Sequence, residues 1–124
     1  MNKALKGVVV CHGPLANALV EATEQISGIN GALVPVSNTG CDRELIERRL
    51  SDAVGDGPAV VFVDMPSGSC SFAAIRQYKD HGSVYVVTGV NLAMLVDFVF
   101  HRTLTPREAA ERAATTGSHA IRQA

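Results

Sequence analysis

A histidine and an aspartate each follow a continuous run of apolar residues in this sequence. Val8–Cys11 leads directly into His12, and Ala59–Val63 leads directly into Asp64. A charge placed after five apolar residues is costly unless it is exposed or paired. A carboxylate that accepts the Nδ1–H of a histidine fixes the ring and leaves Nε2 as a base or nucleophile. His12 and Asp64 are therefore the candidate catalytic pair.

A loop of small residues follows Asp64. It reads Met65-Pro66-Ser67-Gly68-Ser69-Cys70-Ser71 and leads into a predicted helix. Backbone N–H groups of small residues can approach an anion closely, and a helix N-terminus favours negative charge. Together with His12, such a loop suits a phosphoryl group carried on the histidine. The candidate phosphoryl-binding residues are Ser67, Gly68, Ser69 and Cys70.

Other kinds of site find less support in the sequence. The loop matches neither GxxxxGK[ST] nor GxGxxG, which argues against a nucleotide or dinucleotide site, and no GxSxG motif indicates a serine hydrolase. The cysteines Cys11, Cys41 and Cys70 are odd in number and form no CxxC pair. They are expected to be free thiols in a reducing cytosol, with Cys11 in the core. No metal and no bound cofactor are expected.

The three remaining histidines are expected at the surface, in a turn, at the end of a helix and near the C-terminal tail, and their spacing forms no metal-ligand pair such as HExxH. They are His81, His101 and His119.

Hydrophobic patterning predicts strands that alternate with helices. The predicted strands are continuous and apolar, which indicates burial on both faces of a sheet; they are Val8–Cys11, Ala32–Val36, Ala59–Val63 and Val84–Val87. The predicted helices begin at Leu15 (ending before Gly28), Arg43 (to Val54), Phe72 (to Asp80), Leu92 (to His101) and Pro106. Gly28 is expected as a C-terminal cap, and Asp42 and Thr105 as N-terminal caps.

This alternation predicts a three-layer α/β fold, with a mostly parallel sheet of four strands and helices on both faces. It leaves room for a short antiparallel fifth strand at Ala120–Gln123. Residues 1–124 are expected to form a single domain. Because neighbouring strands lie ~4.8 Å apart, the strand ends bring His12, Asp64 and residues 88–91 to one edge of the sheet, where ligands collect in such folds.

The composition argues against nucleic acid and membranes as partners. A net charge of -1 at pH 7 offers no field for nucleic acid or an anionic membrane. No apolar run reaches the ~18 residues of a membrane span, and residues 1–6 are too short and polar for a signal peptide. We therefore expect a cytoplasmic protein.

Three segments in register resemble a known family. His12-Gly13 follows a strand, Val63-Asp64 is followed by Gly68-Ser69, and Gly89-Val90-Asn91 precedes Met94-Leu95. They are similar to the His-Gly, Val-Asp-x-x-Gly-Gly-Ser and Gly-Val-Asn-x-Pro-Met-Leu motifs of the IIA domain of the mannose family, in the bacterial sugar phosphotransferase system. Ser67 stands where that family has a glycine, and Ala93 where it has a proline.

The resemblance implies that His12 is phosphorylated, that Asp64 orients its imidazole, and that Gly68 and Ser69 receive the phosphoryl oxygens. It implies transfer from phospho-HPr to a IIB domain, which phosphorylates sugar at a membrane IIC/IID permease, without a cofactor. Family members are typically homodimers with an exchanged C-terminal strand. Two alternatives remain: a regulatory phosphohistidine protein of an incomplete phosphotransferase system, and the phosphocarrier subunit of a dihydroxyacetone kinase.

Overall fold

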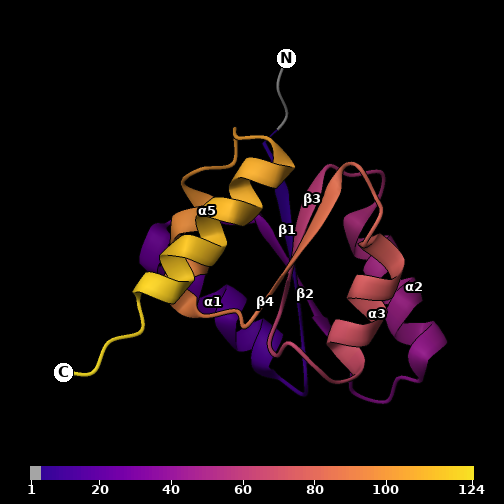
Figure 1. The fold of residues 1–124 in the computed structure, drawn as a ribbon. Coiled ribbons are helices and arrows are strands. Elements are labelled where there is room, and N and C mark those ends of the chain that lie inside the picture. Colours follow the sequence, from indigo (N-terminus) through magenta and orange to yellow (C-terminus); the bar gives the residue numbers. More distant parts are fainter. Residues whose placement is uncertain (1–3) are drawn as a thin grey trace.

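Four parallel strands form one sheet between two layers of helices in the computed structural model, which describes residues 4–124 (Figure 1). The strands are β1 (Lys6–Cys11), β2 (Leu33–Ser37), β3 (Ala59–Val63) and β4 (Val84–Thr88). Their order in the sheet is β2-β1-β3-β4, and every pairing is parallel. The predicted three-layer α/β fold is confirmed; residues 1–3 of the predicted domain lie outside the described residues.

The helices cover both faces of this sheet. They are α1 (Leu15–Ser27), α2 (Arg43–Val54), α3 (Ser69–Tyr78), α4 (Leu92–Val99) and α5 (Pro106–His119). Helices α1, α4 and α5 pack on one face, and α2 and α3 on the other (Figure 1). Within residues 4–124, none of these helices combines the length and the apolar character that crossing a membrane requires.

The predicted caps are present. Gly28 ends α1 with a φ of 73°, a conformation that glycine adopts without steric cost. The Asp42 side chain accepts a hydrogen bond from the backbone of α2. Thr105 and Glu108 form a reciprocal capping box at the start of α5. Local sequence therefore sets where these helices begin or end.

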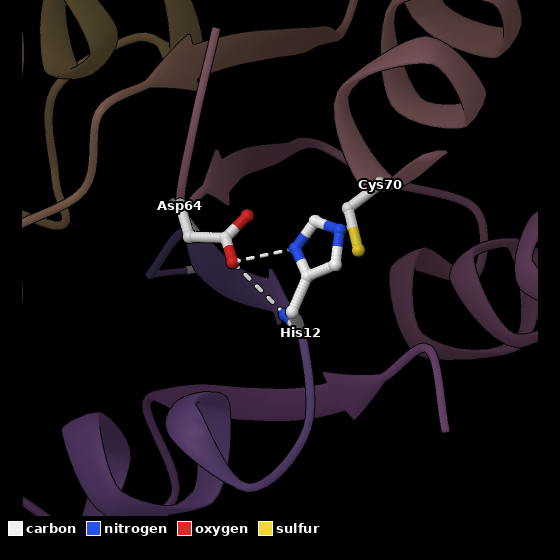
Figure 2. Close-up of side chains that lie close together, drawn as sticks. All are labelled: His12, Asp64 and Cys70. Atoms are coloured by element: carbon white, nitrogen blue, oxygen red, sulfur yellow. Dashed lines mark hydrogen bonds and ion pairs between the residues drawn. The ribbon is translucent and has the colours of Figure 1, made fainter. Parts of the chain in front are cut away.

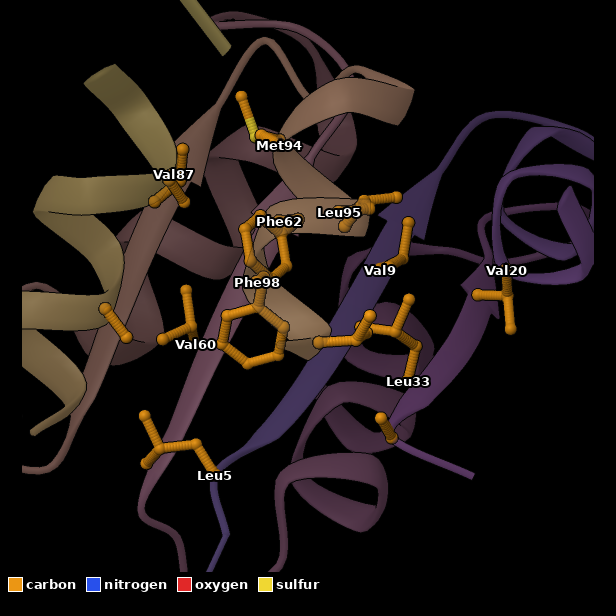
Figure 3. Packing of buried hydrophobic residues seen from close by; sticks show 14 of the residues in the cluster. Leu5, Val9, Val20, Leu33, Val60, Phe62, Val87, Met94, Leu95 and Phe98 are labelled. Carbon is orange, nitrogen blue, oxygen red and sulfur yellow. The ribbon is translucent and has the colours of Figure 1, made fainter. Parts of the chain in front are cut away.

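Two apolar clusters lie on opposite faces of the sheet, because successive side chains of a strand point to opposite sides. In β1, Val8 and Val10 join the cluster under α2 and α3, whereas Val9 faces α1 and α4 (Figure 3). On that second face the rings of Phe62 and Phe98 meet edge to face, with centroids 5.1 Å apart. Both clusters anchor β1 and β3, whose ends carry the candidate pair.

The structure shifts several predicted strand ends by one or two residues, and it differs more in α3, α4 and the C-terminal residues. Helix α3 begins at Ser69 instead of Phe72, because Gly68 takes a φ of 99° and its carbonyl already accepts a hydrogen bond from the Phe72 amide. Helix α3 ends at Tyr78, and α4 ends at Val99. The predicted strand at 120–123 is absent, because α5 runs on to His119 and residues 121–124 form no regular element.

Candidate functional site

His12 and Asp64 stand side by side at the carboxyl edge of the sheet. His12 directly follows β1, and Asp64 directly follows β3, its neighbour. The strand register pairs Val10 with Val63. The two side chains therefore come from adjacent strands, 52 residues apart in sequence. The predicted pairing is present.

One carboxylate oxygen of Asp64 holds both the ring and the main chain of His12. Asp64 Oδ2 lies 2.8 Å from His12 Nδ1 and accepts a hydrogen bond of 2.9 Å from the His12 backbone N–H (Figure 2). The side chain of Asp64 is 8% exposed, and that of His12 is 42% exposed. The carboxylate is therefore shielded, while the imidazole is open to an incoming group.

The charge on Asp64 decides which ring nitrogen carries the proton. Burial alone would raise the pKa of this carboxyl, but the hydrogen bonds from the His12 backbone and ring outweigh burial and lower the pKa below 3.8. Asp64 is then ionised near neutral pH and can only accept hydrogen bonds. Nδ1 must be the donor, so Nε2 of a neutral His12 ring has a free lone pair.

Gly68 lies against the free side of the His12 ring. A Cβ added to Gly68 would sit 3.5 Å from His12 Cε1 and 3.6 Å from Nε2. Its positive φ of 99° also favours glycine. Ser69 follows as the first residue of α3, whose leading backbone N–H groups have no partner within the helix. The face of the ring that bears Nε2 thus lies next to a helix N-terminus, where negative charge is favoured.

The other loop residues take different places. Ser67 is exposed. Cys70 is fully buried in the first turn of α3, beside the His12 ring (Figure 2). Burial, and then the charge of Asp64, raises the pKa of its thiol to about 11. Ser71 is buried and donates to the Pro66 carbonyl at 3.2 Å. Cys70 and Ser71 therefore belong to the packing of the helix start more than to an open loop.

Ser37 and Asn38 support the site, although sequence reasoning assigned residues 37–40 only to a turn. Asn38 Oδ1 accepts the Gly13 backbone N–H at 3.1 Å, and Ser37 Oγ donates to the Gly13 carbonyl at 2.7 Å. Asn38 Nδ2 also lies 3.5 Å from Ser69 Oγ. These contacts join the turn after His12 to the end of β2 and the start of α3. A polar residue just after a strand next to β1 was the signal that could have found them.

Residues 88–91 reach the same edge of the sheet, but their hydrogen bonds hold α4 and α5 in place. The Val90 amide donates to the Val63 carbonyl at 2.9 Å. Asn91 caps α4 through its side-chain oxygen and donates to the Gly117 carbonyl at 3.0 Å. This segment therefore holds α4 and α5 next to β3, the strand that leads into Asp64.

A groove of about 1070 Å³ opens beside the 65–69 loop, between α2 and α3. Exposed Phe72 contributes apolar surface, and the Arg43 guanidinium lies 4.6 Å from the centre of its ring. Arg76 and Lys79 also line the groove. The groove, which includes Gly68, therefore combines apolar surface with these three cationic side chains and the acidic Asp80.

Most of the chain is similar to one protein family. The profile of the family described as "PTS system fructose IIA component" matches residues 6–115. No curated protein sequence matches the chain.

Several solved structures with the same fold are described as phosphotransferase system components. The phosphotransferase system component EIIA of Streptococcus agalactiae has a TM-score of 0.87 and 21% identity, covering 96% of each chain. The mannose/sorbose specific IIA subunit of Enterococcus faecalis has a TM-score of 0.85 and 21% identity, covering 98% of this chain and 96% of that one. The IIA protein associated with the fucose utilization operon of Streptococcus pneumoniae has a TM-score of 0.80 and 19% identity, covering 99% and 96%.

Proposed function

This chain belongs to the family of IIA components of the sugar phosphotransferase system, and from that premise we propose that His12 is its phosphoryl carrier. The observation that carries the proposal is the contact of 2.8 Å between Asp64 Oδ2 and His12 Nδ1. It directs the lone pair of Nε2 away from the carboxylate and toward the side of Gly68. A ring held in this way is suited to form a covalent intermediate at Nε2.

The proposed step is a displacement at phosphorus. The Nε2 lone pair forms an N–P bond to the phosphoryl group, while the bond between phosphorus and the donor histidine of phospho-HPr breaks. The His12 ring becomes cationic, and Asp64 stabilises it through the Nδ1–H hydrogen bond. No proton has to leave Nε2, because that nitrogen bears none.

The transferred phosphoryl group lies next to backbone N–H donors, on the side of the His12 ring that faces away from Asp64. Its oxygens lie toward Gly68, Ser69 and the N-terminus of α3, where backbone N–H groups stabilise negative charge. The absence of a side chain at Gly68 leaves the space for them. Catalysis of phosphoryl transfer depends mainly on positioning the reacting groups and on stabilising their charge.

The proposed direction is from phospho-HPr to His12 and then to a histidine of a IIB domain, in the cytoplasm, for uptake and phosphorylation of sugar by a IIC/IID permease. The exposed ring of His12 allows a partner to reach it. The groove between α2 and α3 lies next to the ring on the side of Gly68 and is available for contact with that partner. In this proposal two copies of the chain also assemble into a homodimer.

The test is transfer of label from phosphoenolpyruvate. With enzyme I and HPr, wild type is expected to take up one phosphoryl group per chain, stable to alkali and labile to acid. His12→Ala is expected to take up none, while His101→Ala, a matched control on a second histidine beside an aspartate, takes up label like wild type. Labelling of His12→Ala would contradict the proposal.

A second arm tests the acceptor. Labelled protein, separated from enzyme I and HPr, is mixed with a IIB domain of the mannose family, and loss of label from His12 is followed. Transfer to IIB supports the role in sugar uptake. Retention of the label would contradict that role while leaving His12 as the phosphoryl carrier.

A further inference from the structure

The sulfur of Cys70 joins the His12–Asp64 pair in a cluster that sequence spacing did not predict. His12, Asp64 and Cys70 each offer one ligand atom, and these atoms all lie within 4.8 Å of one another. They come from the ends of β1 and β3 and from the first turn of α3 (Figure 2). An imidazole nitrogen, a carboxylate oxygen and a thiol sulfur are the donors that Zn²⁺ prefers in proteins.

Asp64 has an unused oxygen at this place. Its Oδ2 serves His12, but its Oδ1 is buried and has no hydrogen-bond partner among residues 4–124. A buried carboxylate oxygen without a partner loses the hydration that it has in water. A cation bound between Asp64 and Cys70 would compensate for that loss.

We propose that His12, Asp64 and Cys70 bind a thiophilic divalent cation such as Zn²⁺, and that the ion blocks phosphorylation of His12. Only the second half of this proposal rests on the proposed function. Binding itself depends on the three side chains alone.

The geometry needs small movements. Zn–N and Zn–O distances of about 2.0–2.2 Å and a Zn–S distance of about 2.3 Å place tetrahedral ligand atoms roughly 3.3–3.6 Å apart. The ligand atoms all lie within 4.8 Å of one another, and His12 Nδ1 and Asp64 Oδ2 are 2.8 Å apart, so side-chain rotations must draw Cys70 closer and move Nδ1 and the carboxylate slightly apart. A water molecule completes the fourth position on the open side of the ring, where His12 is exposed.

The chemical balance of binding is simple. Three bonds form to the ion, which loses waters of hydration in exchange. The Cys70 thiol loses its proton to solvent. The neutral His12 ring binds the ion through Nδ1, the nitrogen that faces Asp64, so its single N–H moves to Nε2 and the hydrogen bond to Asp64 is exchanged for bonds to the ion. Mg²⁺ prefers oxygen ligands and keeps its waters, so the cluster discriminates against it.

The binding test uses the unphosphorylated full-length protein. Zn²⁺ is titrated in competition with a chromophoric chelator, and Co²⁺ is titrated while the thiolate-to-cobalt charge-transfer absorption is recorded. Wild type is expected to bind one ion per chain and to show that absorption. Cys70→Ser is expected to bind roughly 100-fold more weakly, without the absorption. Cys41→Ser, which removes a thiol outside the cluster, is the matched control and is expected to bind like wild type.

Two outcomes would overturn the site: equal Zn²⁺ affinity in Cys70→Ser and wild type, or Co²⁺ bound without thiolate absorption. If Cys70→Ser does not fold, judged by circular dichroism, His12→Ala provides the same test. Its ring is partly exposed, and its loss is also expected to weaken binding.

The blocking effect has its own measurement. Zn²⁺ added before phospho-HPr is expected to stop labelling of wild type, and a chelator is expected to restore it, whereas Mg²⁺ has no effect. Labelling that continues with Zn²⁺ bound would overturn the regulatory half. A protein that binds Zn²⁺ but takes no label even without it would instead contradict the proposed function.

Discussion

Two histidine–aspartate pairs lie at opposite ends of β1, and they differ in what holds the carboxylate. The pair His12–Asp64 follows the last residue of the strand. The pair His101–Asp97 lies near its beginning, where the Leu5 amide donates to the Arg102 carbonyl. By residue type alone the two pairs are equivalent.

The pair at the beginning of β1 is held by structural contacts. Arg112 donates to both oxygens of Asp97, at 2.9 and 3.0 Å. His101 Nδ1 lies 2.7 Å from the backbone carbonyl of Asp97 and 3.5 Å from its carboxylate. The main chain therefore fixes this ring, and an arginine neutralises this carboxylate, tying α4 to α5.

The pair at the other end keeps its carboxylate for the histidine. Among residues 4–124, Asp64 forms no salt bridge to a lysine or arginine, and His12 supplies both of its hydrogen bonds. Gly68 and a helix N-terminus face the free nitrogen of His12. The comparison supports the proposal that His12, and not His101, is the reactive histidine, because its carboxylate serves the ring and its other nitrogen faces open, anion-favouring space.

The largest expected difference between the pairs lies in the rate of phosphoryl transfer. Asp64→Asn keeps an acceptor for the His12 backbone and ring but removes the negative charge that stabilises the cationic imidazole. We expect the rate of labelling from phospho-HPr to fall roughly 100-fold or more. Asp97→Asn is the matched control and is expected to stay within about twofold of wild type. Equal losses in both variants would show that the two pairs do not differ in function.

A smaller effect is expected from crowding the free side of His12. Gly68→Ala places a methyl group 3.5 Å from His12 Cε1 and 3.6 Å from Nε2, where the phosphoryl oxygens would lie. We expect labelling to slow roughly tenfold. Gly89→Ala is the control, because Gly89 has a positive φ of 76° but no atom within 4 Å of an added Cβ. If both variants slowed equally, backbone strain rather than crowding would be the cause.

The smallest effect is on stability in acid. The pKa of Asp64 is lowered in the folded protein, so the unfolded chain binds more protons in this range. The contribution of Asp64 to stability is complete above its unfolded value of 3.8 and is lost as the pH falls through the lower, folded value. Asp64→Asn removes this titration. We therefore expect the free energy of unfolding to depend less steeply on pH in acid, by at most the slope that binding of one proton gives, about 1.4 kcal/mol per pH unit.

Urea unfolding of wild type and Asp64→Asn between about pH 2 and pH 6 measures this difference. The same series on Asp97→Asn shows whether the second pair contributes on the acid side as well. Parallel profiles for wild type and Asp64→Asn would contradict the assignment of a shifted carboxyl to the reactive pair.

The pairing of His12 with Asp64 could be predicted from the sequence because each follows a continuous apolar strand. In a parallel sheet such residues meet at one edge, whatever their separation along the chain. Gly68 was also a candidate from the sequence, because a small residue lets an anion approach closely. The structure places it beside the His12 ring, and its role toward an anion stays a prediction. The second pair shows the limit of this reasoning: His101 was expected at the surface, and nothing in its spacing indicated Arg112 as the partner of Asp97.

Other parts of the site depended on tertiary contacts that local patterns do not contain. Helix α3 begins three residues earlier than predicted, at Ser69, and its first turn buries Cys70 and Ser71, although both residue types are common in loops. The contact of Asn38 with Gly13 joins residues 25 apart in sequence. The cluster of Cys70 with His12 and Asp64 appears only when α3 is placed over the strand ends.

The single oxygen shared by the His12 ring and the His12 backbone amide makes the main chain a spectroscopic reporter of the ring. A proton on an amide that donates to a carboxylate is sensitive to the position and charge of that carboxylate. Any event at Nε2 that shifts the Nδ1 hydrogen bond also changes the environment of the amide 2.9 Å from the same Oδ2. The backbone amide resonance of His12 can therefore follow the chemical state of the imidazole without a label on the side chain.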